Sequence, residues 1–101
     1  MGTWTPITAD DLALLIEADL RDCDEALRSL FSKHRVDPYH APLNRLGQEE
    51  LVFVVARKGN EVMYYEDVEE GFNISPISAD GKILERWCNQ NSLKWALLPW
   101  C

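Results

Sequence analysis

The strongest constraint on the fold comes from residues 51–56, an unbroken apolar run rich in β-branched side chains. Such a run is typical of a strand that is covered on both faces and lies centrally in a sheet. Residues 58–61 follow with the sequence Lys-Gly-Asn-Glu, in which Gly-Asn is a favourable turn pair, and residues 62–65 are again apolar. We therefore predict a β-hairpin in which the lysine of the turn lies opposite the glutamate.

An amphipathic helix is predicted before this hairpin, from about Ala9 to Lys33. Thr8 is placed to cap its start, and Asp37-Pro38 should end it because proline disfavours a helical residue before it. One face of the helix should pack against the sheet, because apolar residues recur at steps of three and four. These residues are Leu12, Leu15, Ile16, Leu20, Cys23, Leu27, Leu30 and Phe31.

Residues 37–48 contain two prolines and a glycine and are predicted to form a connecting loop. The side chains expected to attach this loop to the core are Tyr39, Leu43 and Leu46. After the hairpin, residues 72–77 alternate apolar and polar side chains, which predicts a third strand with Pro76 at its end or at the sheet edge. Residues 83 and 84 are predicted to add a short fourth strand.

The last predicted element is a short helix from about Asn91 to Leu98, capped by Asn89 or Asn91 and ended by Pro99. Taken together, the pattern predicts one α+β domain over residues 1–101, a two-layer sandwich. The long N-terminal helix would pack on an antiparallel meander of three or four strands. Both faces of the central strand are nearly equally apolar, so either face could carry the helix.

The formal net charge of −7 would repel a phosphate backbone, so a nucleic-acid partner is not expected. A negative surface instead attracts basic proteins. The N-terminus shows no basic targeting segment, and no apolar run approaches the roughly 20 residues of a membrane span. We therefore expect a cytoplasmic protein without membrane contact.

Few residues are placed for catalysis or metal binding. The three cysteines form no Cys-x-x-Cys pair, and His34 and His40 are not at metal-ligand spacing, so neither a metal nor a cofactor is predicted. Cys23 lies on the apolar stripe of the helix and is expected to be buried and inert. Cys88 precedes a predicted helix start, which lowers thiol pKa values. An enzyme or ligand-binding site near Cys88 and His40 is therefore one alternative.

The feature that best indicates a function is an acidic turn beside an aromatic strand. Residues 66–70 carry four carboxylates within five positions. Carboxylates would speed the encounter with a basic protein, and neighbouring aromatic side chains would supply affinity. The residues predicted to contact the partner are Tyr65, Glu66, Asp67, Glu69, Glu70 and Phe72.

The aromatic residues leave part of this hypothesis open. Tyr64 and Tyr65 point to opposite faces of their strand, so a core on one side would expose one of them. Trp95 is expected in the core and Trp100 to be partly exposed. A homodimer formed through a sheet edge or the C-terminal tryptophans is a further alternative.

In size, acidity and mixed α/β pattern the chain resembles small bacterial immunity proteins, which neutralise toxin domains. The resemblance extends over the general character of the whole chain and includes no matching motif, so it transfers no functional residues. It implies a small inhibitor of a basic enzyme. The leading prediction is accordingly a non-enzymatic protein-binding domain.

Overall fold

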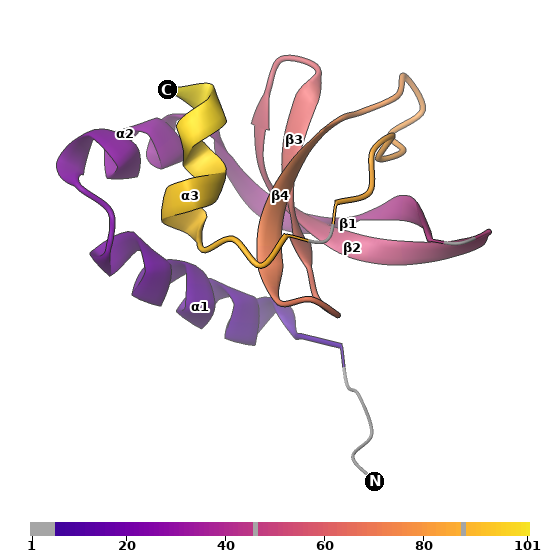
Figure 1. The fold of residues 1–101 in the computed structure, drawn as a ribbon, viewed down its shortest axis with the longest axis horizontal. Coiled ribbons are helices and arrows are strands. Elements are labelled where there is room, and N and C mark those ends of the chain that lie inside the picture. The colour runs from indigo at the N-terminus through magenta and orange to yellow at the C-terminus, as the bar shows by residue number, and fades with distance from the viewer. Residues whose placement is uncertain (1–5, 46, 88) are drawn as a thin grey trace, which may run out of the picture.

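Three α-helices and a four-stranded antiparallel sheet form the part of the chain that the computed structural model describes, residues 6–45, 47–87 and 89–101. The predicted α+β fold is confirmed, with the helices on one side of the sheet (Figure 1). No helix of these described residues is long and apolar enough to cross a membrane. In chain order the elements are α1 (Ala9–Arg21), α2 (Glu25–His34), β1 (Arg35–Arg45), β2 (Gln48–Lys58), β3 (Glu61–Glu66), β4 (Gly71–Pro76), α3 (Leu93–Leu97) and the 3₁₀ helix η1 (Leu98–Trp100).

The strand order is β1-β2-β3-β4, and each strand is antiparallel to its neighbours. β2 and β3 form the predicted hairpin, in which Lys58 pairs with Glu61. Gly59 has a φ angle of 61° at the first central position of the turn. Type II′ hairpin turns require this conformation, and glycine adopts it without steric cost. β2 lies between β1 and β3, as its continuous apolar sequence predicted.

Both faces of the sheet are buried, and each face has its own core. On the face covered by the helices, Val55 and Met63 pack with apolar side chains of α1, α2 and α3. On the opposite face, Val54 and Tyr64 pack in a second core with Ile83. Because alternate strand residues point to opposite faces, this arrangement explains why β2 and β3 are apolar on both sides.

The second core is closed by the segment that follows β4. Ile83 makes isolated β-bridges with Leu43 of β1 and with Ile77, and its backbone N–H donates a hydrogen bond to the carbonyl oxygen of Pro42 at 2.9 Å. This segment therefore joins the two edges of the sheet. The short strand predicted at Ile83 and Leu84 is reduced to these bridges.

The predicted N-terminal helix is present but shorter than expected, because residues 9–33 form two helices. Asp24 is the N-cap of α2, and its Oδ1 accepts a hydrogen bond from the backbone N–H of Leu27 at 2.9 Å. Aspartate is more favourable at a cap than inside a helix. Cys23 is buried at the junction, so the apolar spacing continues across the break and conceals it. The predicted cap at Thr8 is confirmed.

The predicted loop at residues 37–48 is wrong for most of its length, since residues 35–45 form β1. Proline lacks a backbone donor and is therefore confined to edge strands, strand starts and bulges. β1 is the first strand of the sheet, where Pro42 pairs with Leu51. The register is irregular between Arg35 and Tyr39, the stretch that contains the other proline.

The three side chains expected to attach this segment to the core have different environments. Leu43 is buried, as predicted, whereas Tyr39 is 40 % exposed. Leu46 lies outside the described residues. The anchoring of β1 therefore relies on Leu43 and its neighbour Ala41, which is also buried in the second core.

The C-terminal helix begins at Leu93, two residues later than predicted, and Ser92 is its N-cap residue. It continues directly into η1, so Pro99 does not end the helical segment but lies within it. Proline fits there because the first residues of a helical segment need no intrahelical donor.

The predictions for the two C-terminal tryptophans are both wrong. Trp100 is only 3 % exposed. Its Nε1 donates a hydrogen bond to Glu61 Oε1 at 3.2 Å, and its ring meets that of His34 edge-on at 5.6 Å. Trp95, expected in the core, is 58 % exposed because it lies on the side of α3 opposite the buried Leu93, Ala96 and Leu97.

Candidate binding site at the acidic turn

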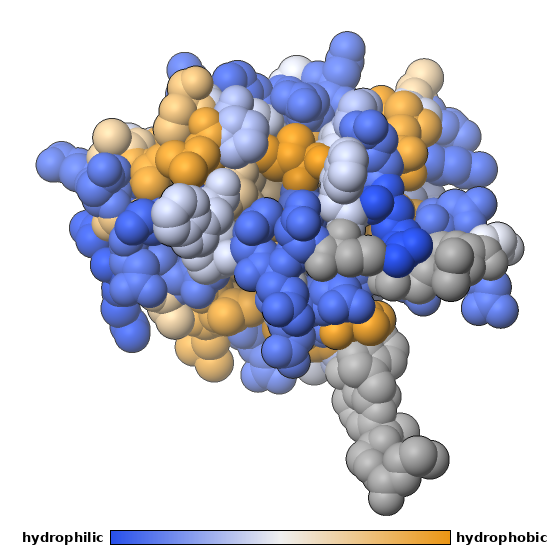
Figure 2. All heavy atoms as spheres, in the orientation of Figure 1, coloured by the Kyte–Doolittle hydropathy of each residue, from blue (hydrophilic) through white to orange (hydrophobic). Residues whose placement is uncertain are grey.

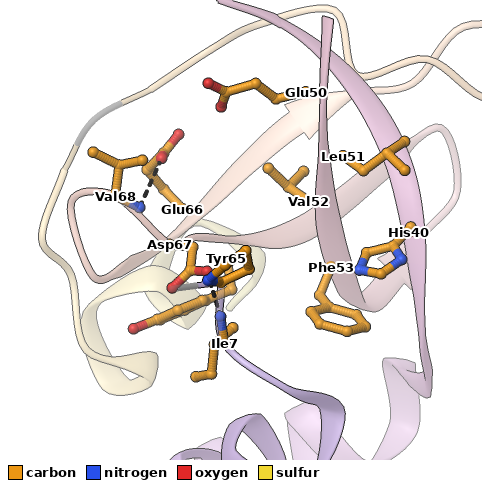
Figure 3. A pocket seen from close by; sticks show the side chains of 11 residues that line it. Ile7, His40, Glu50, Leu51, Val52, Phe53, Tyr65, Glu66, Asp67 and Val68 are labelled. Carbon is orange, nitrogen blue, oxygen red and sulfur yellow. Dashed lines mark hydrogen bonds between the residues drawn. The ribbon is translucent and has the colours of Figure 1, made fainter. Parts of the chain in front are cut away.

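The acidic turn, residues 67–70, joins β3 to β4 and is fixed by hydrogen bonds at its start. Asp67 Oδ2 accepts a hydrogen bond from the backbone N–H of Ile7 at 2.6 Å. Glu66 Oε1 accepts one from the backbone N–H of Val68 at 3.2 Å, and Figure 3 shows both contacts. The turn is therefore tied to the segment before α1, and its conformation is held by specific contacts.

The six residues predicted to contact a partner fall into two groups. Tyr65, Glu66 and Phe72 are buried, with exposed fractions of 5 %, 1 % and 1 %. The expectation that they form an exposed acidic and aromatic surface is therefore wrong. The other three, Asp67, Glu69 and Glu70, are partly or fully exposed and remain available to a partner.

The two aromatic residues are buried because they form a cross-strand pair under the helices. Tyr65 of β3 lies opposite Phe72 of β4, and their ring centroids are 5.0 Å apart. Side chains directly opposite in an antiparallel pair share one face of the sheet. Here that face packs against α3, through Leu93 and Leu97 in the same core.

Burial and acidic side chains from two parts of the chain raise the pKa of the Tyr65 hydroxyl. Burial raises the pKa of Tyr65 to about 12, and the negative charges of Glu70, Asp67 and Asp19 contribute to the rise. Asp19 belongs to α1, and its Oδ2 also accepts a hydrogen bond from the backbone N–H of Leu93 at 3.0 Å. The fold thus adds an α1 carboxylate to those of the turn.

A pocket of about 280 Å³ lies beside the turn. This volume is at the lower limit of small-molecule sites, which are roughly 300–1,000 Å³. Its walls come from the segment before α1, from β1, β2 and the end of β3, and from the turn, as Figure 3 shows. The lining residues are Pro6, Ile7, His40, Glu50, Leu51, Val52, Phe53, Tyr65, Glu66, Asp67 and Val68.

The pocket combines an apolar interior with carboxylates. In Figure 3, Glu66 and Asp67 lie on the side of the turn, whereas His40 and Phe53 lie on the opposite side. The rings of His40 and Phe53 stack with centroids 4.1 Å apart. The apolar part also reaches the surface, because Leu51 is 62 % exposed.

Of the two residues named for the alternative enzymatic site, one lies at the pocket. His40 lines the pocket, whereas Cys88 lies outside the described residues. Cys23 is buried, and this burial raises the pKa of its thiol, with the nearby charge of Asp19 adding to the effect. Within the described ranges, no group of three or more His, Cys, Asp or Glu side chains could hold a metal ion.

A second hollow, of about 250 Å³, lies between Trp87 and Trp95, which are 46 % and 58 % exposed. Lys94 Nζ lies 5.5 Å from the Trp95 ring centroid, which is within cation–π range. On the face in Figure 2, hydrophobic residues lie in small groups separated by hydrophilic ones. The homodimer alternative, through a sheet edge or the C-terminal tryptophans, stays a prediction, and of those tryptophans Trp95 is exposed whereas Trp100 is buried.

Sequence reasoning missed the pocket, although Leu51 and Val68 gave a partial signal. Each is an apolar residue next to a carboxylate, and each is exposed. Comparisons with protein-family models, curated proteins and solved structures found no match to this chain.

Proposed function

We propose that this chain is a protein-binding domain that engages a basic protein partner through the acidic turn and the pocket beside it. The observation that carries the proposal is the joining of exposed carboxylates to an apolar hollow. Asp67 both belongs to the turn and lines the pocket. A partner could therefore be attracted by charge and retained by apolar contact at one place.

Electrostatics supports the encounter step. The net charge of −7 attracts a positively charged protein, and the field is strongest where carboxylates gather. Glu69 and Glu70 project from a turn whose start is fixed, so little ordering is required when they meet the partner. Charged groups at the rim of an interface act mainly on association rate and on its salt dependence.

Apolar side chains support the retained affinity. Since Tyr65 and Phe72 are buried, the exposed Leu51 and Val68 take the place of the predicted aromatic anchors. They are 62 % and 46 % exposed and stand at the pocket. An inhibitor of a basic enzyme, as the resemblance to immunity proteins implies, would use such a surface, and a cytoplasmic location stays part of the prediction.

The experiment compares two double charge reversals in affinity capture from host lysate. Glu69→Lys with Glu70→Lys alters the turn, and Asp22→Lys with Glu85→Lys alters exposed carboxylates elsewhere. Each pair raises the net charge by four. We expect a basic protein to be held by the wild type and the control but lost from the turn variant. Purified, that protein should bind more weakly as salt increases.

Equal loss from both double variants would show a general effect of net charge and would contradict a site at the turn. Retention of the same protein by all three chains would also contradict it. Folding of each variant is checked first by its unfolding transition, so that loss of binding is not confused with loss of structure.

A further inference from the structure

We infer that the outer edge of β4 at Ile74 binds an extended peptide segment, which adds to the sheet in the hollow between Trp87 and Trp95. The inference goes beyond the proposed function, because this hollow is lined by β4, by the segment after it and by the C-terminal helices rather than by the acidic turn. It follows from the hydrogen bonding of β4, from the walls of the hollow and from the exposed tryptophan rings.

The middle of β4 presents a backbone donor and acceptor that the sheet does not use. β4 is the last strand of the sheet, so one of its edges has no neighbouring strand within the described residues. The backbone N–H of Phe72 points outward there, since it donates to the carbonyl oxygen of Asn91 at 2.9 Å. The carbonyl oxygen of Pro76 also points outward and accepts from the N–H of Leu84 at 3.1 Å. Alternate residues of an antiparallel strand share this direction, so the N–H and C=O of Ile74 point away from β3 as well.

These two groups of Ile74 are open to a ligand. Among the hydrogen bonds of the described residues, none involves the outward N–H or C=O of Ile74, and Ile74 lines the hollow. An unpaired strand edge is a template for another strand. In an antiparallel pair a single residue supplies both partners, whereas parallel pairing distributes them over neighbouring residues. One uncovered position therefore favours an antiparallel peptide.

The walls of the hollow are held in place beside this position. Asn73 Nδ2 donates a hydrogen bond to the carbonyl oxygen of Asn89 at 3.2 Å, and the bond from Phe72 to Asn91 holds the same segment two residues later. In Figure 1, α3 lies on one side of β4, and the segment that follows β4 lies on the other. The groove along the edge is therefore formed before a peptide arrives, which lowers the cost of binding.

The tryptophan rings determine which side chains the peptide would carry. Residues opposite each other in an antiparallel pair point to the same face, so the peptide residue opposite Ile74 points toward the helices, as Ile74 does. There Trp95 and Pro99 line the hollow, which favours an apolar side chain. The peptide residues before and after it point to the other face, toward Trp87 and Asn89.

A second copy of the chain does not fit this edge. Pairing of two β4 strands around Ile74 would place Phe72 of one copy opposite Pro76 of the other. At both positions the chain's own segments already occupy the outward hydrogen-bonding groups. The occupant is therefore a free extended segment, which can bend away from the sheet on either side of its paired residue.

The test titrates the ¹⁵N-labelled full chain with three peptides and follows its amide signals by NMR. Acetyl-Ser-Val-Ser-amide carries the apolar side chain and its backbone N–H. The same peptide methylated on the valine nitrogen lacks that donor, and acetyl-Ser-Ser-Ser-amide lacks the apolar side chain. We expect the first peptide to shift the amides of Ile74 and Trp95 with a millimolar dissociation constant. Loss of the donor or of the apolar side chain should each weaken binding at least about fivefold.

Two variants at position 74 supply the matched control. Ile74→Pro removes the outward N–H and leaves the ladder to β3 intact, because Pro76 already stands at an equivalent position of this strand. Ile74→Val keeps the N–H with a side chain of similar size. We expect the valine variant to bind the first peptide within about twofold of the wild type, and the proline variant at least about fivefold more weakly. If the proline variant does not fold, the three peptides test the inference on the wild type alone.

Equal binding of the methylated and unmethylated peptides would overturn the inference, because the hollow would then recognise apolar surface without the β4 backbone. Unshifted amides of Ile74 and Trp95 with the first peptide would overturn it as well. If the Ile74 amide shifts as the concentration of the chain alone is raised, a second copy occupies the edge and the inference fails. Capture of a basic partner through Glu69 and Glu70 is tested separately and does not depend on these results.

Discussion

Replacing Tyr65 with phenylalanine should remove a loss of stability that the wild type shows at alkaline pH. The pKa of Tyr65 is raised from 10.0 to about 12 in the folded protein, first by burial and then by the charges of Glu70, Asp67 and Asp19. Between these values the unfolded chain releases the phenolic proton while the folded chain retains it. The wild type is therefore fully stabilised below pH 10 and loses that contribution as the pH rises to 12.

The magnitude follows from the size of the shift. One pKa unit corresponds to about 1.4 kcal/mol, so a shift of two units sets an upper limit of about 3 kcal/mol, and solvent screening of the carboxylates lowers the expected loss to about 1–2 kcal/mol across this interval. Among the described residues, the Tyr65 hydroxyl has no hydrogen-bond partner, and its ring packing on Phe72 is retained by phenylalanine. The substitution should therefore cost little at neutral pH.

The assay is urea unfolding of both proteins at intervals between pH 8 and pH 12, conditions set by the two pKa values. The quantity of interest is the difference in unfolding free energy, because lysine titration affects both chains alike. Tyr39→Phe, at a side chain that is 40 % exposed, controls for the loss of a tyrosine elsewhere. A wild-type minus variant difference that stays constant from pH 8 to pH 12 would refute the reasoning.

Two further predictions concern the segment that covers the sheet. Gly71→Ala should lower stability by about 1–3 kcal/mol in urea unfolding, because a Cβ there would lie 2.6 Å from Gln90 Cα; an unchanged midpoint would contradict this contact. Tyr64→Phe should cost about 1–3 kcal/mol in thermal unfolding, because the Tyr64 hydroxyl accepts a hydrogen bond from the backbone N–H of Trp87 at 2.7 Å. A Tyr64→Phe variant as stable as the wild type would show that this hydrogen bond does not stabilise the fold.

The parts of the fold that the sequence predicted correctly depend on neighbouring residues. The β2–β3 hairpin follows from two apolar runs and a Gly-Asn pair between them. Thr8 caps α1 because its hydroxyl can reach the backbone N–H of Asp11 within one turn. Such signals act over a few residues and need no knowledge of the rest of the chain.

The errors occurred where tertiary structure changes the meaning of a local signal. Prolines in residues 37–48 indicate a loop unless the strand lies at an edge, and edge position depends on the whole sheet. The break between α1 and α2 is marked by Asp24, an ordinary exposed residue of an amphipathic helix unless it caps. The buried Cys23 kept the apolar spacing intact and favoured the wrong interpretation.

Only the charge of the candidate site could be predicted from the sequence. Four clustered carboxylates are visible in the sequence, but the exposure of Tyr65 and Phe72 depends on which elements cover each face of the sheet. A sheet covered on one side would expose either Tyr64 or Tyr65. In this structure the helices cover Tyr65, and the segment containing Ile83 covers Tyr64.

This double coverage changes where binding affinity has to come from. With the aromatic pair inside the core, the turn itself offers mainly charge, which accelerates association but retains a partner poorly. In the proposed function, the apolar contact that charge lacks would come from Leu51 of β2, from Val68 of the turn and from the pocket that both residues line. Substitutions at the exposed carboxylates should therefore act mainly on the association rate, and substitutions at Leu51 mainly on the dissociation rate.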